Sequence, residues 1–223
     1  MKFFQLKANP NKIGQVEELV INKEGYDPWA PGGIYTIPLE GTPHPNFFLP
    51  DCCLSPKSQY TDFLNVVAWS GRMLTVSERV YSLLTKLNLD YHSVFQTNVY
   101  DKRRSMNKSY FGIYFHWFRN QCYIDWGKTT FSIVKGFTVT NELIKFDDYN
   151  HYRQWRYENF SIKNSELKSA RVKDLYIKDS VIEKDLFVLD DIERIYIASE
   201  RLRSSFEIAE ITGVEFKDLP TIG

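Results

Sequence analysis

One short pattern occurs twice in the sequence, at a constant offset of 122 residues. Residues 72–80 read RMLTVSERV, and residues 194–202 read RIYIASERL. In each copy a short apolar strand leads into Ser-Glu-Arg, and apolar residues then recur at spacings of three and four, the period of a helix that buries one face. Ser77 and Ser199 can each accept a hydrogen bond from the unpaired amides of a first helical turn. The pattern therefore predicts two helices, one after each serine.

A further strand is predicted after each of these helices, at residues 94–99 and 214–216. Gly213 is well placed to end the second helix, because glycine adopts the left-handed conformation that closes a helix C-terminus. The sequence thus suggests an internal duplication of a strand–helix–strand unit, covering residues 72–99 and 194–216. The alternative is that this unit is common in proteins and that the shared Ser-Glu-Arg is a coincidence.

The remainder of the chain is dominated by strand signals, which are short runs of β-branched and aromatic residues bounded by Gly, Asn, Asp or Lys. Eight of the nine prolines lie between residues 10 and 56. Proline donates no backbone hydrogen bond, so residues 1–57 are expected to be extended pieces joined by turns that pack on a regular body, residues 58–223. The predicted fold class is α+β and β-rich, with a mostly antiparallel or mixed sheet and two principal helices.

Composition narrows the classes of function. The 223 residues contain 28 Lys and Arg and 28 Asp and Glu, so the formal net charge is zero. This balance argues against a dedicated duplex nucleic-acid binder, which needs a basic excess. No apolar run approaches the roughly 20 residues of a spanning helix, and the first residues lack a secretory core. We expect a soluble cytoplasmic protein that does not associate with a membrane.

Residues that could carry chemistry are present but show no recognisable spacing. The three cysteines, Cys52, Cys53 and Cys122, are interpreted as reduced thiols, because an odd number with two adjacent members does not form a disulfide framework. The four histidines lack the spacing of a zinc site, and no phosphate loop or dinucleotide fingerprint occurs. No catalytic residue, metal or cofactor is predicted, and the protein is not expected to be an enzyme. The alternative is an unrecognised Cys-His or carboxylate site.

Several side chains are candidates for an interface. Residues 149–157 interleave rings with cations, which is typical of protein interfaces and of single-strand nucleic-acid grooves. A basic run begins at Lys102 in a predicted hairpin loop, and paired acids follow a late apolar strand. Residues 1–141 carry a net charge of +4 and residues 142–223 one of −4. The candidates are Tyr149, Tyr152, Trp155, Arg103, Arg104, Asp190, Asp191 and Glu193.

The last part of the chain resembles a known group of proteins. The segments that carry the resemblance are LFVL at residues 186–189, IYIASERL at residues 195–202 and ITGVEF at residues 211–216. They are similar to the ending of the bacterial immunity proteins of polymorphic toxin systems, in particular the families numbered eleven and forty-three, first described as a domain of unknown function. Upstream, YID at residues 123–125 and VSER at residues 76–79 also fit the family's order. The resemblance covers roughly residues 60–219.

The resemblance implies an inhibitor that binds the cognate toxin encoded by a neighbouring gene. Such proteins protect the producing cell in its cytoplasm against a toxin delivered by a contact-dependent or type VI-like secretion route. They need no active site, and the resemblance transfers no catalytic residue. Because such toxins are often nucleases with basic grooves, the acidic candidates Asp190, Asp191 and Glu193 are expected to face the toxin. A second hypothesis is a nucleic-acid-binding module that uses the basic loop and residues 149–157.

Overall fold

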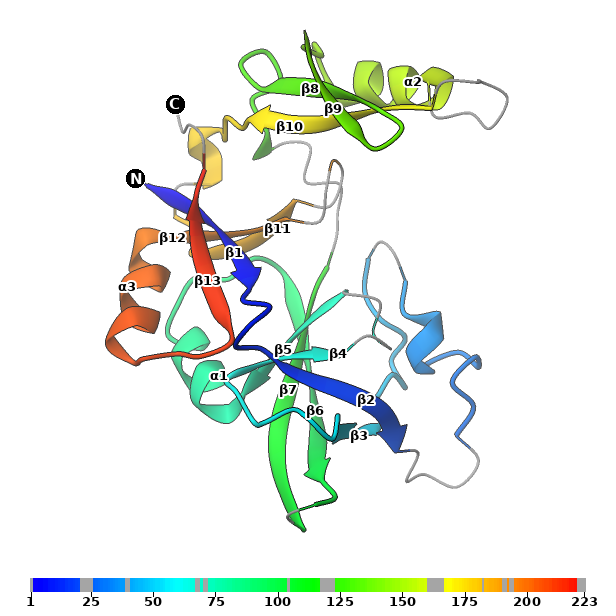
Figure 1. The fold of residues 1–223 in the computed structure, drawn as a ribbon, viewed down its shortest axis with the longest axis vertical. Helices are drawn as coiled ribbons and strands as arrows, with labels where there is room; N and C mark the ends of the chain where they lie inside the picture. The colour runs from blue at the N-terminus through cyan, green and yellow to red at the C-terminus, as the bar shows by residue number, and fades with distance from the viewer. Residues whose placement is uncertain are drawn as a thin grey trace.

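The strands of the protein form three groups, which follow one another along its longest axis in Figure 1. The computed structural model describes residues 2–20, 26–38, 41–66, 69, 72–103, 105–116, 123–159, 167–181, 183–189, 192 and 195–219. Parallel and antiparallel pairs both occur, because β2 pairs in parallel with β4 and β3 with β6, whereas the other paired strands are antiparallel. The α+β class with a mostly antiparallel or mixed arrangement is thereby confirmed.

The largest group is a closed barrel with the strand order β2-β3-β6-β7-β5-β4. Its members are β2 (Gly14–Val20), β3 (Asp51–Leu54), β4 (Phe63–Val66), β5 (Met73–Ser77), β6 (His92–Asp101) and β7 (Met106–Phe115). The proline-rich segment packs against this barrel, since Ile34, Phe47 and Leu49 belong to the same buried core as Trp69 and Tyr114. Residues 1–57 also supply β2 and β3 to the barrel itself.

The other two groups are open sheets. The four-stranded sheet has the order β11-β12-β1-β13, formed by β1 (Phe3–Ala8), β11 (Leu186–Leu189), β12 (Ile195–Ser199) and β13 (Val214–Asp218). The three-stranded sheet has the order β10-β8-β9, formed by β8 (Thr130–Lys135), β9 (Thr138–Ile144) and β10 (Lys168–Asp174). The helices are α1 (Glu78–Leu84), α2 (Tyr149–Asn159) and α3 (Glu200–Ile208), with 3-10 turns at Ile34–Thr36 and Asp179–Val181.

The barrel and the four-stranded sheet contain the same arrangement of strands and helix. In the barrel, β4, β5, α1 and β6 follow one another in the chain, and β7 lies between β5 and β6. In the four-stranded sheet, β11, β12, α3 and β13 do the same, and β1 lies between β12 and β13. The second arrangement thus takes its inserted strand from the N-terminus. A shared origin of the two arrangements by duplication stays a prediction.

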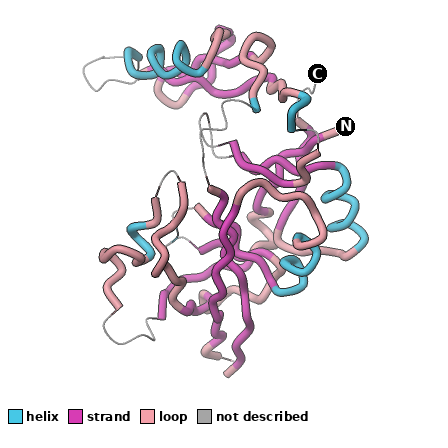
Figure 2. Tube along the Cα trace, turned by 180° about the vertical axis from the view of Figure 1, so that it is seen from behind, coloured by secondary structure: helices cyan, strands magenta, loops and turns pink. Residues whose placement is uncertain are grey.

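The helices after Ser77 and Ser199 form as the sequence predicts. The Ser77 Oγ accepts a hydrogen bond from the Val80 amide at 3.4 Å, and the Ser199 Oγ accepts one from the Leu202 amide at 3.1 Å. Apolar side chains of both helices share one core, in which Val80 and Leu84 of α1 join Leu202 and Phe206 of α3. Figure 2 shows the two helices on the same side of the molecule, seen from behind.

A third helix, α2, was not predicted from the sequence. Its rings at Tyr149, Tyr152 and Trp155 recur every three residues, so one side of the helix packs against the three-stranded sheet. Polar residues lie between these rings, so the segment as a whole is not hydrophobic and its apolar side is difficult to recognise from the sequence. The aromatic segment is therefore a helix that covers part of a core.

Candidate functional site

The three aromatic interface candidates, Tyr149, Tyr152 and Trp155, lie on α2 and are buried to different extents. Tyr152 is buried, and its ring contacts Phe131 and Phe146 at centroid distances of 5.8 and 5.2 Å. Tyr149 and Trp155 are partly buried against the same core. Much of this ring surface therefore holds α2 on the sheet, whereas the outer side of the helix exposes Arg156 and Tyr157.

The charged candidates are mostly outside the described residues, which do not include Asp190, Asp191, Glu193 or Arg104. Arg103 is described and lies in the turn between β6 and β7, as the predicted hairpin loop requires. Its Nε lies 3.1 Å from Oδ1 of the buried Asp101, and its Nη2 donates to the Ser58 carbonyl oxygen at 2.8 Å. These bonds tie Arg103 to the barrel and neutralise its charge locally, which weakens the hypothesis of a basic nucleic-acid-binding loop.

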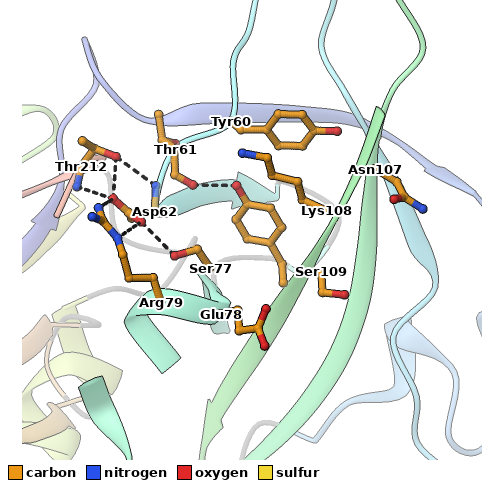
Figure 3. A pocket seen from close by; sticks show the side chains of 11 residues that line it. Tyr60, Thr61, Asp62, Ser77, Glu78, Arg79, Asn107, Lys108, Ser109 and Thr212 are labelled. Carbon is orange, nitrogen blue, oxygen red and sulfur yellow. Dashed lines mark hydrogen bonds and ion pairs between the residues drawn. The ribbon is translucent and has the colours of Figure 1, made fainter. Parts of the chain in front are cut away.

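A polar cavity of about 640 Å³ lies where β4, β5 and α1 meet the segment after α3 (Figure 3). The first half of β7 lines the rest of the cavity, and Asp62, just before β4, lies on the side formed with Ser77, Arg79 and Thr212. The Asp62 carboxylate accepts hydrogen bonds from Arg79 Nη2 at 2.6 Å and from the Ser77 Oγ at 2.9 Å. It also accepts bonds from the backbone amide and the Oγ1 of Thr212, both at 2.9 Å. One buried carboxylate thus connects a strand, a helix and a segment 150 residues away.

An equivalent cluster surrounds Asp185, just before β11. Its carboxylate accepts hydrogen bonds from the Ser199 Oγ at 2.6 Å, from Arg201 Nε at 2.9 Å and from the Asn88 backbone amide at 2.8 Å. Asn88 follows α1, just as Thr212 follows α3. Each aspartate therefore binds the Ser and Arg of its own unit and the segment after the helix of the other unit.

The two clusters have the same arrangement of hydrogen bonds around a carboxylate. In each case the donors converge on one carboxylate and leave its oxygens engaged within the chain. Burial alone raises the pKa of the Asp62 carboxyl, but hydrogen bonds from Arg79, Thr212 and Ser77 outweigh burial and hold this pKa below its ordinary value. Burial also raises the pKa of the Asp185 carboxyl, but hydrogen bonds from Arg201, Ser199 and Asn88 outweigh burial and hold this pKa below its ordinary value. Both clusters therefore link the two units through one carboxylate, and each is called a brace below.

Neither aspartate was predicted from the sequence, although a signal was present. In the two copies of the Ser-Glu-Arg pattern, an aspartate stands directly before the preceding strand, at residues 62 and 185. The offset there is 123 rather than 122, so a comparison at constant offset passes over it. Asn88 gave no such signal, because it contributes its backbone amide, which any residue other than proline could supply at that position.

Stability should fall at acid pH partly through these two carboxylates. A carboxyl whose pKa is lower in the folded state stabilises the fold above its unfolded pKa of about 3.9, and this contribution disappears as the pH falls through the folded pKa. We expect the urea midpoint of the wild type to decrease between about pH 5 and pH 2. The double variant Asp62→Asn/Asp185→Asn should lose part of this dependence. Identical pH dependence in both proteins would contradict the assignment of the braces.

Of the two described cysteines, Cys52 does not have the properties of a nucleophile. Cys52 is buried, and burial raises the pKa of its thiol to about 12, so the thiol stays protonated at neutral pH. Cys53 is also buried and lines a cavity of about 580 Å³ beside Tyr100 and Met106. Cys122 lies outside the described residues. The nucleophilic-cysteine hypothesis therefore gains no support from Cys52.

Exposed apolar side chains gather on the three-stranded sheet. Phe137, in the turn between β8 and β9, is 105% exposed, and Val139 and Leu143 on β9 and Leu167 before β10 are also exposed. The Gly136 amide donates to the Leu167 carbonyl oxygen at 3.0 Å, which holds the two segments together. Phe137 and Val139 line a hollow of about 500 Å³ with Val134 and Ile192, and two cations, Arg156 of α2 and Arg171 of β10, also line it.

Large apolar side chains that are exposed together mark an interaction site more often than isolated ones do. The surface formed by Phe137, Val139, Leu143 and Leu167, named the hairpin surface below, combines a protruding ring with a hollow that apolar side chains and two arginines line. Exposed rings and arginines are typical of protein interfaces, in which a few anchors supply most of the binding energy.

Neither a scan against protein-family models nor a search of curated proteins finds a match to this chain. Within the part of the chain that the structure describes, no group of three or more His, Cys, Asp or Glu side chains could hold a metal ion. No helix among these residues is long and apolar enough to cross a membrane.

Proposed function

We propose that this protein is an immunity protein, which binds a cognate toxin and neutralises it by stoichiometric occlusion. The observation that carries the proposal is the hairpin surface, whose four apolar side chains are exposed and of which Phe137 and Val139 also line a hollow. Leaving such side chains in water has a cost of roughly 25 cal/mol for each Å² of apolar area, which binding a partner would recover. A surface of this kind suits an inhibitor that acts by contact alone.

The resemblance supports the same proposal from a separate direction. Its segments at residues 186–189, 195–202 and 211–216 form β11, β12 with α3, and β13, so they belong to one continuous unit of the fold. Under the proposal the toxin is encoded by a neighbouring gene and reaches the cytoplasm of kin cells by a contact-dependent or type VI-like route. The protein would meet it there, without a cofactor.

The hairpin surface differs from the acidic face that the sequence suggested. The side chains that define it are apolar, and the hollow beside them is also lined by two cations, Arg156 of α2 and Arg171 of β10. Contact with the toxin would therefore depend on apolar anchors, with charge setting orientation and the rate of encounter. The contribution of Asp190, Asp191 and Glu193 stays a prediction.

Co-expression with the toxin of the neighbouring gene tests the proposal. Wild-type protein should restore growth and co-purify with the toxin in equal amounts. Phe137→Ala should weaken toxin binding by roughly 10- to 100-fold, because an interface anchor contributes about 1.4–3 kcal/mol. Isothermal titration calorimetry would measure this change.

Ile208→Ala is a matched control, since Ile208 is 85% exposed but lies on α3. It should bind the toxin as the wild type does. Continued killing without co-purification would overturn the proposal. Equal loss of affinity in Phe137→Ala and Ile208→Ala would instead exclude the hairpin surface as the contact.

A further inference from the structure

A second group of exposed rings lies on the proline-rich segment, far from the hairpin surface in sequence. Trp29 is 70% exposed and Tyr35 is 41% exposed, and their ring centroids are 4.6 Å apart. The segment that carries them projects from the side of the barrel in Figure 1. Residues 26–37, named the tryptophan loop below, therefore present two large rings together to solvent.

The backbone of the tryptophan loop is closed by its own hydrogen bonds. The Trp29 amide donates to Asp27 Oδ1 at 2.8 Å, and the Tyr35 amide donates to the Pro28 carbonyl oxygen at 3.0 Å. The Thr36 Oγ1 lies 3.0 and 2.9 Å from the carbonyl oxygens of Ala30 and Gly33, to which it can donate. These bonds span both sides of the loop, so Trp29 and Tyr35 are held on a defined backbone.

Two glycines make this closure possible. Gly32 has φ +90°, a conformation that other residues rarely adopt. A Cβ on Gly33 would lie 2.4 Å from the Pro28 carbonyl oxygen, closer than any side chain allows. The chain approaches itself here only because both residues lack a side chain.

The loop is also fixed to the barrel beneath it. Ile34 and Ile37 are buried in the barrel core, and the Ile34 amide donates to the Tyr26 hydroxyl at 2.9 Å. The Tyr26 ring in turn packs against Phe48 at a centroid distance of 4.7 Å. The buried side chains point into the core, whereas Trp29 and Tyr35 remain outside it.

We infer that the tryptophan loop is a preformed anchor that inserts into a concave apolar pocket of a protein partner. Trp and Tyr are the residues that most often dominate interface energetics, and a backbone already held in place loses little entropy on binding. A projecting pair of rings fits a concave surface on the partner. A toxin that is inhibited by occlusion of its cleft would provide such a surface. The inference rests on the proposed function, under which the pocket belongs to the toxin.

A protein fits this loop better than a lipid surface does. Loops and helices that bind at membrane surfaces combine rings with Lys and Arg, which attract anionic headgroups. Residues 26–38 read YDPWAPGGIYTIP and contain neither Lys nor Arg. Their one ionisable carboxylate, Asp27, would be repelled by an anionic surface.

Toxin binding by Trp29→Ala, Trp29→Phe and Tyr91→Ala tests the inference by calorimetry. Trp29→Ala should weaken binding by roughly 10-fold or more, and Trp29→Phe by less, because phenylalanine keeps part of the ring. Tyr91→Ala is the control, since Tyr91 is 72% exposed but precedes β6. Thermal unfolding should be the same for wild type and Trp29→Ala, which would exclude misfolding as the cause.

The outcomes separate this inference from the proposed function. If the wild type binds the toxin and Trp29→Ala binds equally well, the inference is overturned and the proposed function stands. If the wild type does not bind, both are overturned. A blue shift of tryptophan fluorescence with phosphatidylglycerol vesicles, absent in Trp29→Phe, would overturn the inference in favour of a lipid surface.

Discussion

Asp62→Ala is expected to lower the free energy of unfolding by about 2–4 kcal/mol. The substitution removes the acceptor shared by Arg79, Ser77 and Thr212, and it leaves the partly buried Ser77 hydroxyl and the Thr212 amide without this partner. The Arg79 side chain is about half exposed and can hydrogen-bond to water, so the donors left without an acceptor, rather than an uncompensated charge, account for most of the cost. Urea unfolding followed by circular dichroism would measure the change.

The second brace provides an internal comparison. Asp185→Ala should be destabilising by a similar amount, because Ser199, Arg201 and Asn88 repeat the same contacts. Asp147→Ala should change stability by less than about 0.5 kcal/mol, because its side chain is 95% exposed. If either brace variant behaved like Asp147→Ala, that aspartate would not link the two units.

The local parts of the fold could be predicted from the sequence. The helices after Ser77 and Ser199 depend on a cap and on apolar spacing within a few residues, and both features can be read directly. The position of β1 could not be predicted, because it pairs with β12 and β13 through registers such as Phe3 with Ser199 and Phe4 with Asp218. No local pattern specifies partners at that separation.

The candidate surfaces were harder to predict than the helices. Phe131 and Phe137 are six residues apart and look equivalent in the sequence, yet one is fully buried and the other fully exposed. Trp29 could be assigned to a loop from its prolines and glycines, but its exposure depends on how that loop packs on the barrel. Exposure is a property of tertiary packing, so a single sequence does not reveal which rings are available to a partner.

Phe131→Ala is expected to produce the largest loss of stability among these variants, about 3–5 kcal/mol. The Phe131 ring has no exposed area and contacts Trp126, Phe146 and Tyr152 at centroid distances of 6.0, 5.0 and 5.8 Å. Truncation would leave a cavity where β8 meets α2, and the large surrounding rings cannot easily close it. The loss should appear as a lower urea midpoint with little change in the slope.

Phe137→Ala is the matched control, with the same change of residue type at the other end of the same hairpin. Its stability should remain within about 0.5 kcal/mol of the wild type, because the ring is surrounded by water. Under the proposed function the two variants separate folding from binding, since Phe137→Ala should stay folded and lose toxin affinity. If Phe137→Ala unfolded as readily as Phe131→Ala, its ring would belong to the core, and the hairpin surface could not be a free interface.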